Sequence, residues 1–310
     1  MKKSSVLFNA ALLAIALPLS GAALAQGKSK STAKATAAPV TLRLDLTKPD
    51  DAVKAFRKLQ ASLVDGKPAI FWFQGNVYSR VAGEPDKHLF SYQAFNIRAT
   101  HTAPDVGRGY GFRLVSKELL LYMDPGTGEV LRTWKNPWTN KEVEVVHVAN
   151  DPVNQRPMYA QSDRGPFKFT GTVKQGTVIQ SAEVPLFYTN PMGGDYQPYV
   201  GGTYHAIELF NFYASEDELL GSSDGAENAT VSWARVSQWL PWMEMGGRAG
   251  WLIFNGAGRR ISSLDALPEA VKREVEASYP EYKTPPPGDD PRPNETSWTY
   301  FKKKVDAKKK

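Results

Sequence analysis

His147 and Asp151, in the segment His-Val-Ala-Asn-Asp-Pro-Val-Asn, are the first residues whose types and spacing could do chemistry. His147 shares an expected strand face with Val143 and Val145, which predicts that it points inward. A histidine near a carboxylate can serve as a general base, because the partner fixes its tautomer. The alternative is structural, since Asn-Asp-Pro sequences start turns and His147 could be a satisfied core residue. The sequence leaves both interpretations open.

Glu208 is a second carboxylate that could act with His147 in place of Asp151. Arg98 or Arg235 would then stabilise negative charge developing on a substrate. The chain has no cysteine and no Gly-x-Ser-x-Gly segment, which excludes thiolate chemistry and gives no sign of a serine nucleophile. The enzyme hypothesis is therefore a cofactor-independent lyase, isomerase or hydratase. It requires His147 and a carboxylate to meet around one cavity.

The glycine-rich segment 190–210 invites a phosphate-binding or metal-binding interpretation, and the sequence supports neither. It lacks the lysine and the spacing of a phosphate loop. In a strand, His205 and Glu208 would lie on opposite faces, and the histidines of the chain show no metal-type spacing. We expect no metal and no cofactor. The glycine pairs are instead predicted to form a bend that leads into a strand.

Several expected strands carry a face that mixes aromatic rings with amide and charged groups. Such a face fits either solvent or the lumen of a barrel that holds a mostly apolar ligand at a few polar anchors. The lumen interpretation predicts a protein that binds a hydrophobic or aromatic small molecule, with the acid–base enzyme as the alternative. Its candidate ligand-binding residues are Trp72, Asn76, Tyr92, Asn96, Tyr204, His205 and Trp233.

The elements that must position these residues are mostly strands. From Gly66 onward, about ten segments rich in aromatic and β-branched residues alternate with Gly, Pro and Asp turn signals. They predict a mostly β fold: a single-domain antiparallel barrel or strongly coiled sheet, lipocalin-like in shape. Helical spacing predicts one helix at 50–63, before the strands, and one at 267–279, after them. A short strand is expected at 41–46, and the aromatic and methionine cluster at 239–248 is expected to pack in the core.

The two ends of the chain have a different composition from its body. Residues 1–25 have the layout of a cleaved signal peptide, with lysines, an apolar run and a small-residue site ending at Ala25. Residues 26–40 are predicted to be a flexible tether, 41–301 a single β-rich domain and 302–310 a lysine-rich tail. We therefore expect a periplasmic or secreted protein. No later segment is apolar over a membrane-spanning length, so no transmembrane segment is expected.

The formal net charge of +6 does not indicate a nucleic-acid partner. Its lysines gather in the leader, the tether and the tail, and the body between them is mildly acidic. A nucleic-acid binder carries its positive charge on a folded face. The charge distribution leaves a small apolar or aromatic molecule as the expected partner, and the oligomeric state open.

Four segments resemble one known family: 147–154, 190–210, the run from Trp233 through Trp-Leu-Pro-Trp-Met to Asn255, and 293–301. They are similar to the bacterial proteins grouped as domain of unknown function 1838. The resemblance covers the chain from about residue 45 to residue 301. It implies one domain, and it implies no particular activity, cofactor or catalytic residue.

Overall fold

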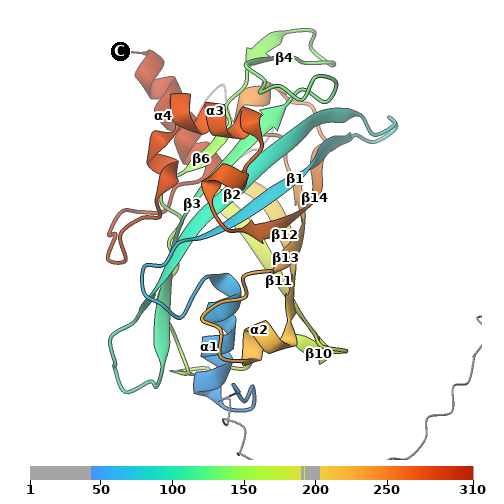
Figure 1. The fold of residues 1–310 in the computed structure, drawn as a ribbon. Helices are drawn as coiled ribbons and strands as arrows, with labels where there is room; N and C mark the ends of the chain where they lie inside the picture. The colour runs from blue at the N-terminus through green and yellow to red at the C-terminus, as the bar shows by residue number, and fades with distance from the viewer. Residues whose placement is uncertain (1–42, 190–191, 193–202, 310) are drawn as a thin grey trace, which may run out of the picture. The chain divides into compact units, whose positions relative to one another are not determined.

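The fold is described here from a computed structural model that covers residues 43–189, 192 and 203–309 (Figure 1). These residues belong to one compact unit, Thr41–Lys310. The predicted signal peptide and tether lie outside the described residues, and so does most of the predicted glycine-rich bend. Residues 43–46 are not a strand, in contrast to the sequence prediction. Leu44 N–H donates to the Leu220 carbonyl and Asp45 N–H donates to the carboxylate of Asp51, so the segment forms no ladder with a neighbouring strand.

One antiparallel sheet of ten strands forms the centre of this unit, in the order β10-β11-β12-β13-β14-β1-β2-β3-β6, with β7 also paired to β3. Its long strands are β1 (Ala69–Arg80), β2 (His88–Thr102), β3 (Gly111–Met123), β11 (Thr177–Thr189), β12 (Thr203–Ser215), β13 (Thr230–Ser237) and β14 (Trp251–Ile261). The short ones are β6 (Val148–Asn150), β7 (Met158–Tyr159) and β10 (Thr172–Lys174). Two small hairpins stand apart: β4 (Thr133–Lys135) with β5 (Glu142–Glu144), and β8 (Gln161–Ser162) with β9 (Gly165–Pro166).

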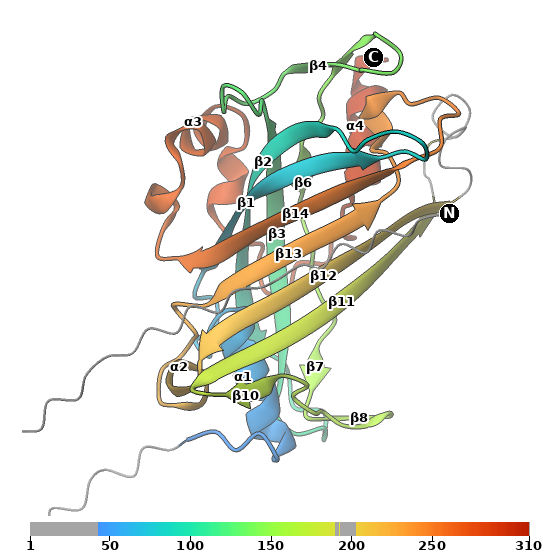
Figure 2. The same cartoon turned by 90° about the vertical axis from the view of Figure 1, so that its right-hand side faces the viewer.

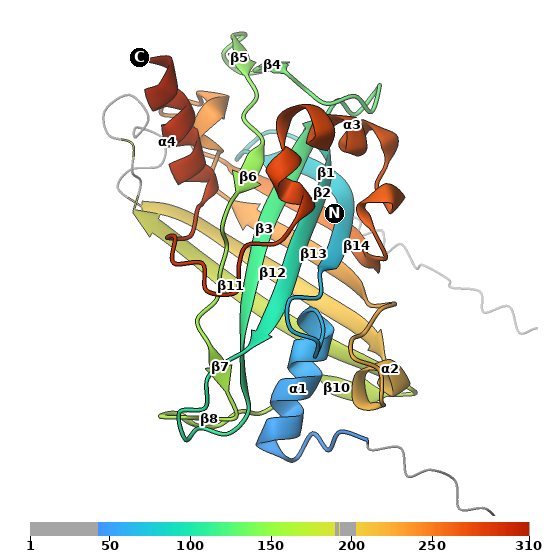
Figure 3. The same cartoon turned by 60° about the vertical axis from the view of Figure 1, so that its left-hand side comes forward.

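The fold is mostly β, as predicted, but its large sheet does not close into a barrel. In the described part of the chain, β11 pairs on one side with β12 and on the other only with the three residues of β10. The residues that could supply a closing strand, between β3 and β10, are broken by proline and Asx turns into pieces of two or three residues. Figures 2 and 3 show the result: the sheet coils until β3 and β6 lie across from β11, β12 and β13.

Within the described part of the chain, four α-helices accompany the sheet, where the sequence predicted two. The predicted ones are α1 (Pro49–Gln60) and α3 (Glu269–Ser278). Helix α1 starts with Pro49 and two aspartates and ends with Arg57 and Lys58, which suits the helix dipole. The others are α2 (Glu216–Leu220) and α4 (Ser297–Lys308), and the described residues also include the 3₁₀ turns η2 (Pro241–Met243), η3 (Leu264–Ala266) and η4 (Pro280–Lys283). Because α4 runs through Lys308, most of the lysine-rich end is helical rather than a separate tail.

The coiling gives the sheet a concave face and a convex face with separate apolar clusters. On the concave side, α1 and α2 pack at one end, while α4 and the segment 239–245 pack at the other (Figure 3). That segment is buried, as predicted, with Trp239, Trp242, Met243 and Met245 at most 3% exposed. On the convex side, α3 covers strands β1, β2 and β3. The middle of the concave face lies between the helices α1 and α2 at one end and α4 with the segment 239–245 at the other.

Candidate functional site

Glu208 and Arg235 form an ion pair in the middle of the concave face. They are direct cross-strand neighbours on β12 and β13, and Arg235 Nη1 donates to Glu208 Oε1 over 2.9 Å. Arg235 Nη2 donates to the hydroxyl of Tyr204 over 3.0 Å. The side chains of Glu208 and Arg235 keep 18% and 13% of their surface exposed. Burial raises the pKa of Glu208, and Arg235 opposes that rise.

Glu118 brings a second carboxyl group to the same face from β3. Its Oε2 accepts a 3.4 Å hydrogen bond from Asn150 Nδ2 on β6. Burial raises the pKa of Glu118, and repulsion from Glu208 raises it further. Strands β3 and β12 are separated in the sheet by four others, so this repulsion shows how far the sheet coils. The concave face therefore holds two carboxyl groups that interact with each other.

Arg98 and Asn96 extend this polar cluster along β2. Arg98 Nη1 donates to Gln60 Oε1 over 2.9 Å, and Nη2 donates to Asn96 Oδ1 over 3.0 Å. The guanidinium lies 4.8 Å from the ring centroid of Phe71. Burial lowers the pKa of Arg98 to about 10, so it remains a cation at neutral pH. Its charge is held by neutral amides and an aromatic ring.

Tyr92, Trp233 and Phe254 form the aromatic part of the concave face. The ring of Tyr92 lies 5.6 Å from that of Trp233 in an edge-to-face arrangement, and Trp233 lies 5.7 Å from Phe254. Tyr92 fits only because Gly75 and Gly256 have no side chain: a Cβ at Gly256 would come within 2.0 Å of the Tyr92 hydroxyl. The two glycines lie opposite each other on β1 and β14 and form a notch for this ring.

Several buried polar atoms on this face have no hydrogen-bond partner among the described residues. They come from strands β2, β6 and β13: Tyr92 Oη, Arg98 Nε, Asn150 Oδ1, Trp233 Nε1 and Arg235 Nε. Buried polar groups in folded proteins are nearly always satisfied by protein, water or ligand. These five atoms are exceptions to that rule, and they share the concave face with Glu118 and Glu208.

Seven of the residues singled out in the sequence share this concave face: Tyr92, Asn96, Arg98, Tyr204, Glu208, Trp233 and Arg235. The other three ligand-binding candidates lie on the convex face. There Trp72 donates to Gln93, Asn76 accepts from Ser91, and exposed His205 packs its ring against Phe187. The two-residue alternation of side chains correctly predicted which residues of one strand share a face. It does not predict which face of β1 lies on the same side of the sheet as a given face of β2.

His147 and Asp151 take other places in the structure. His147 is 6% exposed, and its Nδ1 accepts a 3.1 Å hydrogen bond from the backbone N–H of Tyr122. Burial lowers the pKa of His147 to about 4. Asp151 instead contacts Lys117 and Arg292, whose Nη2 lies 2.8 Å from Asp151 Oδ1. The pair is not brought together, and His147 has the contacts of a satisfied core histidine.

A family model described as Protein of unknown function (DUF1838) matches residues 66–305. The chain belongs to the DUF1838 family. The matched range contains every strand of the large sheet, and with it the whole concave cluster. A comparison with curated proteins found no match. In the part of this DUF1838 protein that the structure describes, no helix is both long and apolar enough to cross a membrane.

Glu118 and Asn150 are the members of the cluster that the sequence-based site prediction missed. Glu118 alternates with Ser116, Leu120 and Tyr122 along β3, so it is a lone carboxylate on a face that is otherwise apolar or small. A single carboxylate on an otherwise apolar strand face is the sequence feature that could have identified Glu118 as a candidate site residue. Among the described residues of this DUF1838 chain, no group of three or more histidine or acidic side chains is arranged to hold a metal ion.

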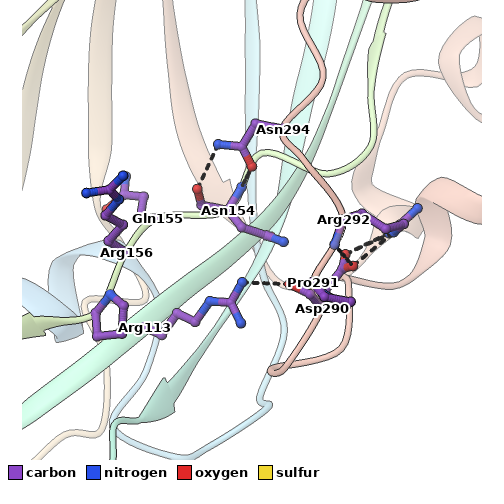
Figure 4. A pocket seen from close by; sticks show the side chains of 9 residues that line it. Arg113, Asn154, Gln155, Arg156, Asp290, Pro291, Arg292 and Asn294 are labelled. Carbon is purple, nitrogen blue, oxygen red and sulfur yellow. Dashed lines mark hydrogen bonds and ion pairs between the residues drawn. The ribbon is translucent and has the colours of Figure 1, made fainter.

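A separate polar pocket of about 280 Å³ lies where the C-terminal segment crosses the convex face of β3 (Figure 4). Its arginines are largely engaged: Arg113 donates to the carbonyls of Gly288 and Asp290, and Arg292 pairs with the carboxylates of Asp290 and Asp151. Asn154 and Asn294 exchange two hydrogen bonds beside them. These contacts fasten the C-terminal segment to the sheet, and they account for the polarity of the pocket without a ligand.

Proposed function

We propose that this DUF1838 protein is exported and binds a hydrophobic or aromatic small molecule on the concave face of its open, coiled sheet. The observation that carries the proposal is the gathering of unpartnered polar atoms around Glu118 and Glu208, on a face otherwise lined by aromatic and aliphatic groups. Ligand sites are typically apolar hollows with a few placed polar anchors. Half-buried Phe210, Trp233 and Val148 supply the apolar wall.

The two ends of the concave face are covered by packed elements, whereas its middle is not, and this difference supports a ligand-sized hollow in the middle of the face. At the ends, the concave side chains are buried against α1 or against the segment 239–245. In the middle, side chains from opposite strands keep partial exposure: Ala94, Asn96, Glu118, Val148, Ala182, Leu186, Glu208, Phe210, Trp233 and Arg235. A hollow open at its centre and closed at its ends is suited to a small molecule rather than to a chain.

Native mass spectrometry of the mature protein, purified gently from its own host, tests the proposal. We expect a bound small molecule of fixed mass, and we expect Trp233→Ala to lose it because the substitution removes an aromatic wall. The convex-face variant Trp251→Ala, whose tryptophan is 43% exposed, is the matched control and should keep the ligand. A ligand retained equally by both variants would place binding elsewhere.

The second candidate function is a cofactor-independent lyase, isomerase or hydratase that uses this same face. It is favoured by two carboxyl groups with raised pKa that interact across the hollow, beside a guanidinium that can stabilise negative charge. Glu118 and Glu208 take the acid–base roles, in place of His147. Turnover of a bound compound by the wild type, lost in Glu208→Gln while binding persists, would establish it. Unchanged turnover in that variant would exclude this mechanism.

A further inference from the structure

Glu118 differs from the other carboxyl group on the concave face in having no cation in contact. Glu208 is paired with Arg235, whereas within the described residues Glu118 accepts its hydrogen bond from the amide of Asn150. Arg98, whose charge lowers the pKa of Glu118 as that of Arg235 does, directs its two terminal nitrogens to Gln60 and Asn96. Burial and the charge of Glu208 raise the pKa of Glu118 against the opposing charges of Arg98 and Arg235, and a carboxyl group in its neutral form can donate a hydrogen bond.

Each carboxyl group also has unused hydrogen-bonding capacity beside it. Asn150 donates to Glu118 through Nδ2, and its Oδ1 has no partner among the described residues although Asn150 is 8% exposed. Beside Glu208, the Nε atom of Arg235 is also unpartnered. This face therefore offers a ligand both an acceptor, Asn150 Oδ1, and a donor, Arg235 Nε. A ligand group that only accepts or only donates hydrogen bonds would pair with one of these two atoms and leave the other unpartnered.

The charges of the cluster decide which ligands fit. Glu208 and Arg235 neutralise each other, and every terminal nitrogen of Arg98 and Arg235 already donates within the cluster. A ligand anion would have to compete with the present partners of these arginines, and a ligand cation would be buried beside two guanidinium groups; both are costly. An uncharged hydroxyl or keto oxygen avoids this cost and can hydrogen bond to Glu118. The half-buried Phe210 and Val148 offer apolar contact to the remainder of such a molecule.

We infer that the ligand of the concave face is an uncharged, oxygen-bearing apolar molecule, such as an aromatic alcohol, whose oxygen binds at Glu118. This inference rests on the proposed function and specifies the ligand chemistry for the same site. Glu118 is a specificity-determining residue in this arrangement: it selects the neutral oxygen group, while the aromatic wall holds the apolar body.

Equilibrium dialysis at pH 7 with three probes of one shape tests the inference: 2-naphthol, 2-methylnaphthalene and 2-naphthoate. We expect 2-naphthol to bind about tenfold more tightly than the other two, the effect of one buried hydrogen bond. In Glu118→Leu the preference should fall to within about twofold, while 2-methylnaphthalene still binds. Glu276→Leu, at a glutamate that is 72% exposed on α3, is the matched control and should keep the preference.

The outcomes separate the two proposals. Binding of 2-methylnaphthalene with no advantage for 2-naphthol, or an advantage that survives Glu118→Leu, overturns the inference and leaves the proposed function standing. Tighter binding of 2-naphthoate overturns it in favour of an anion site. Binding of none of the probes counts against the proposed function itself. If Glu118→Leu does not fold, Asn150→Ala removes the partner of Glu118 and should reduce the preference severalfold.

Discussion

Glu118 of β3 and Glu208 of β12 repel each other across the concave face, although four strands separate them in the sheet. Two carboxyl groups so placed are not equivalent. Glu208 has Arg235 as a direct partner, whereas Glu118 has an amide. Burial raises the pKa of both carboxyl groups, and only Glu208 has a guanidinium in direct contact that opposes the rise, an asymmetry on which both specific binding and acid–base chemistry can be built.

Replacing only one partner of the Glu208–Arg235 ion pair should destabilise the protein strongly. Replacing Arg235 by Met leaves Glu208 without its counter-charge, and we expect a loss of about 3–5 kcal/mol in the free energy of unfolding. The double variant Arg235→Met with Glu208→Leu removes both charges and should recover most of that loss. Urea denaturation of the two single variants and the double variant measures the coupling. Additive losses would mean that the ion pair contributes nothing specific.

Glu118→Gln should stabilise the protein at neutral pH, on the order of 1 kcal/mol, the size of a typical single substitution. The folded-state pKa of Glu118 is raised above its usual value by burial and by Glu208. Between the usual and the raised pKa, the folded state binds more protons than the unfolded state, so wild-type stability falls as pH rises. Arg98, Arg235, Tyr122 and Tyr204 also face this hollow, and none of them changes in the variant. Denaturation at several pH values should show the advantage of Gln shrinking as pH falls, and a constant advantage would contradict the assigned environment.

His147 should make stability depend on pH in the opposite direction. Its folded-state pKa of about 4 lies below the usual 6.5, because burial disfavours the charged ring. The unfolded state therefore binds more protons between these values, so stability is full above pH 6.5 and is lost as pH falls toward 4. The loss attributable to His147 is about 3 kcal/mol over this range. Subtracting the pH profile of His147→Asn from that of the wild type isolates it, and parallel profiles would show that His147 is not buried in the neutral form.

Much of the fold followed from the sequence because local patterns determined it. Helix α1 has spacing, end charges and a starting proline, and the long strands have β-branched and aromatic residues between turn signals. Whether the sheet closes was not predictable in this way. Closure depends on whether β11 finds a partner on its free side, and that long-range pairing leaves no mark on the residues of β11 itself.

The candidate site was predicted in part for the same reason. Alternation placed Tyr204 with Glu208, and Tyr92 with Asn96 and Arg98, because period two is a local property of each strand. The register between neighbouring strands decides which side chains share a face of the sheet. The register of β1 with β2 places Trp72 on the convex face and Tyr92 on the concave face. Glu118 was overlooked because a single carboxylate in an apolar strand gains its meaning only from Glu208, far away in the chain.

The notch that holds Tyr92 should make Gly256 sensitive to the smallest substitution. In Gly256→Ala the added Cβ would lie 2.0 Å from the Tyr92 hydroxyl and 2.3 Å from the Gln74 carbonyl oxygen. Such overpacking forces shifts in a packed sheet, and we expect a loss of about 3 kcal/mol in the free energy of unfolding.

Gly247→Ala is the matched control for this substitution. A Cβ there meets nothing within 4 Å, and the backbone at Gly247 has no positive φ angle, so the change should be nearly neutral. Thermal denaturation compares the two variants directly. Adding Tyr92→Phe to Gly256→Ala should recover part of the stability but not all of it, because the contact with the Gln74 carbonyl persists. Equal stability of Gly256→Ala and Gly247→Ala would show that Tyr92 does not lie over the notch, and the aromatic wall of the proposed site would then need another arrangement.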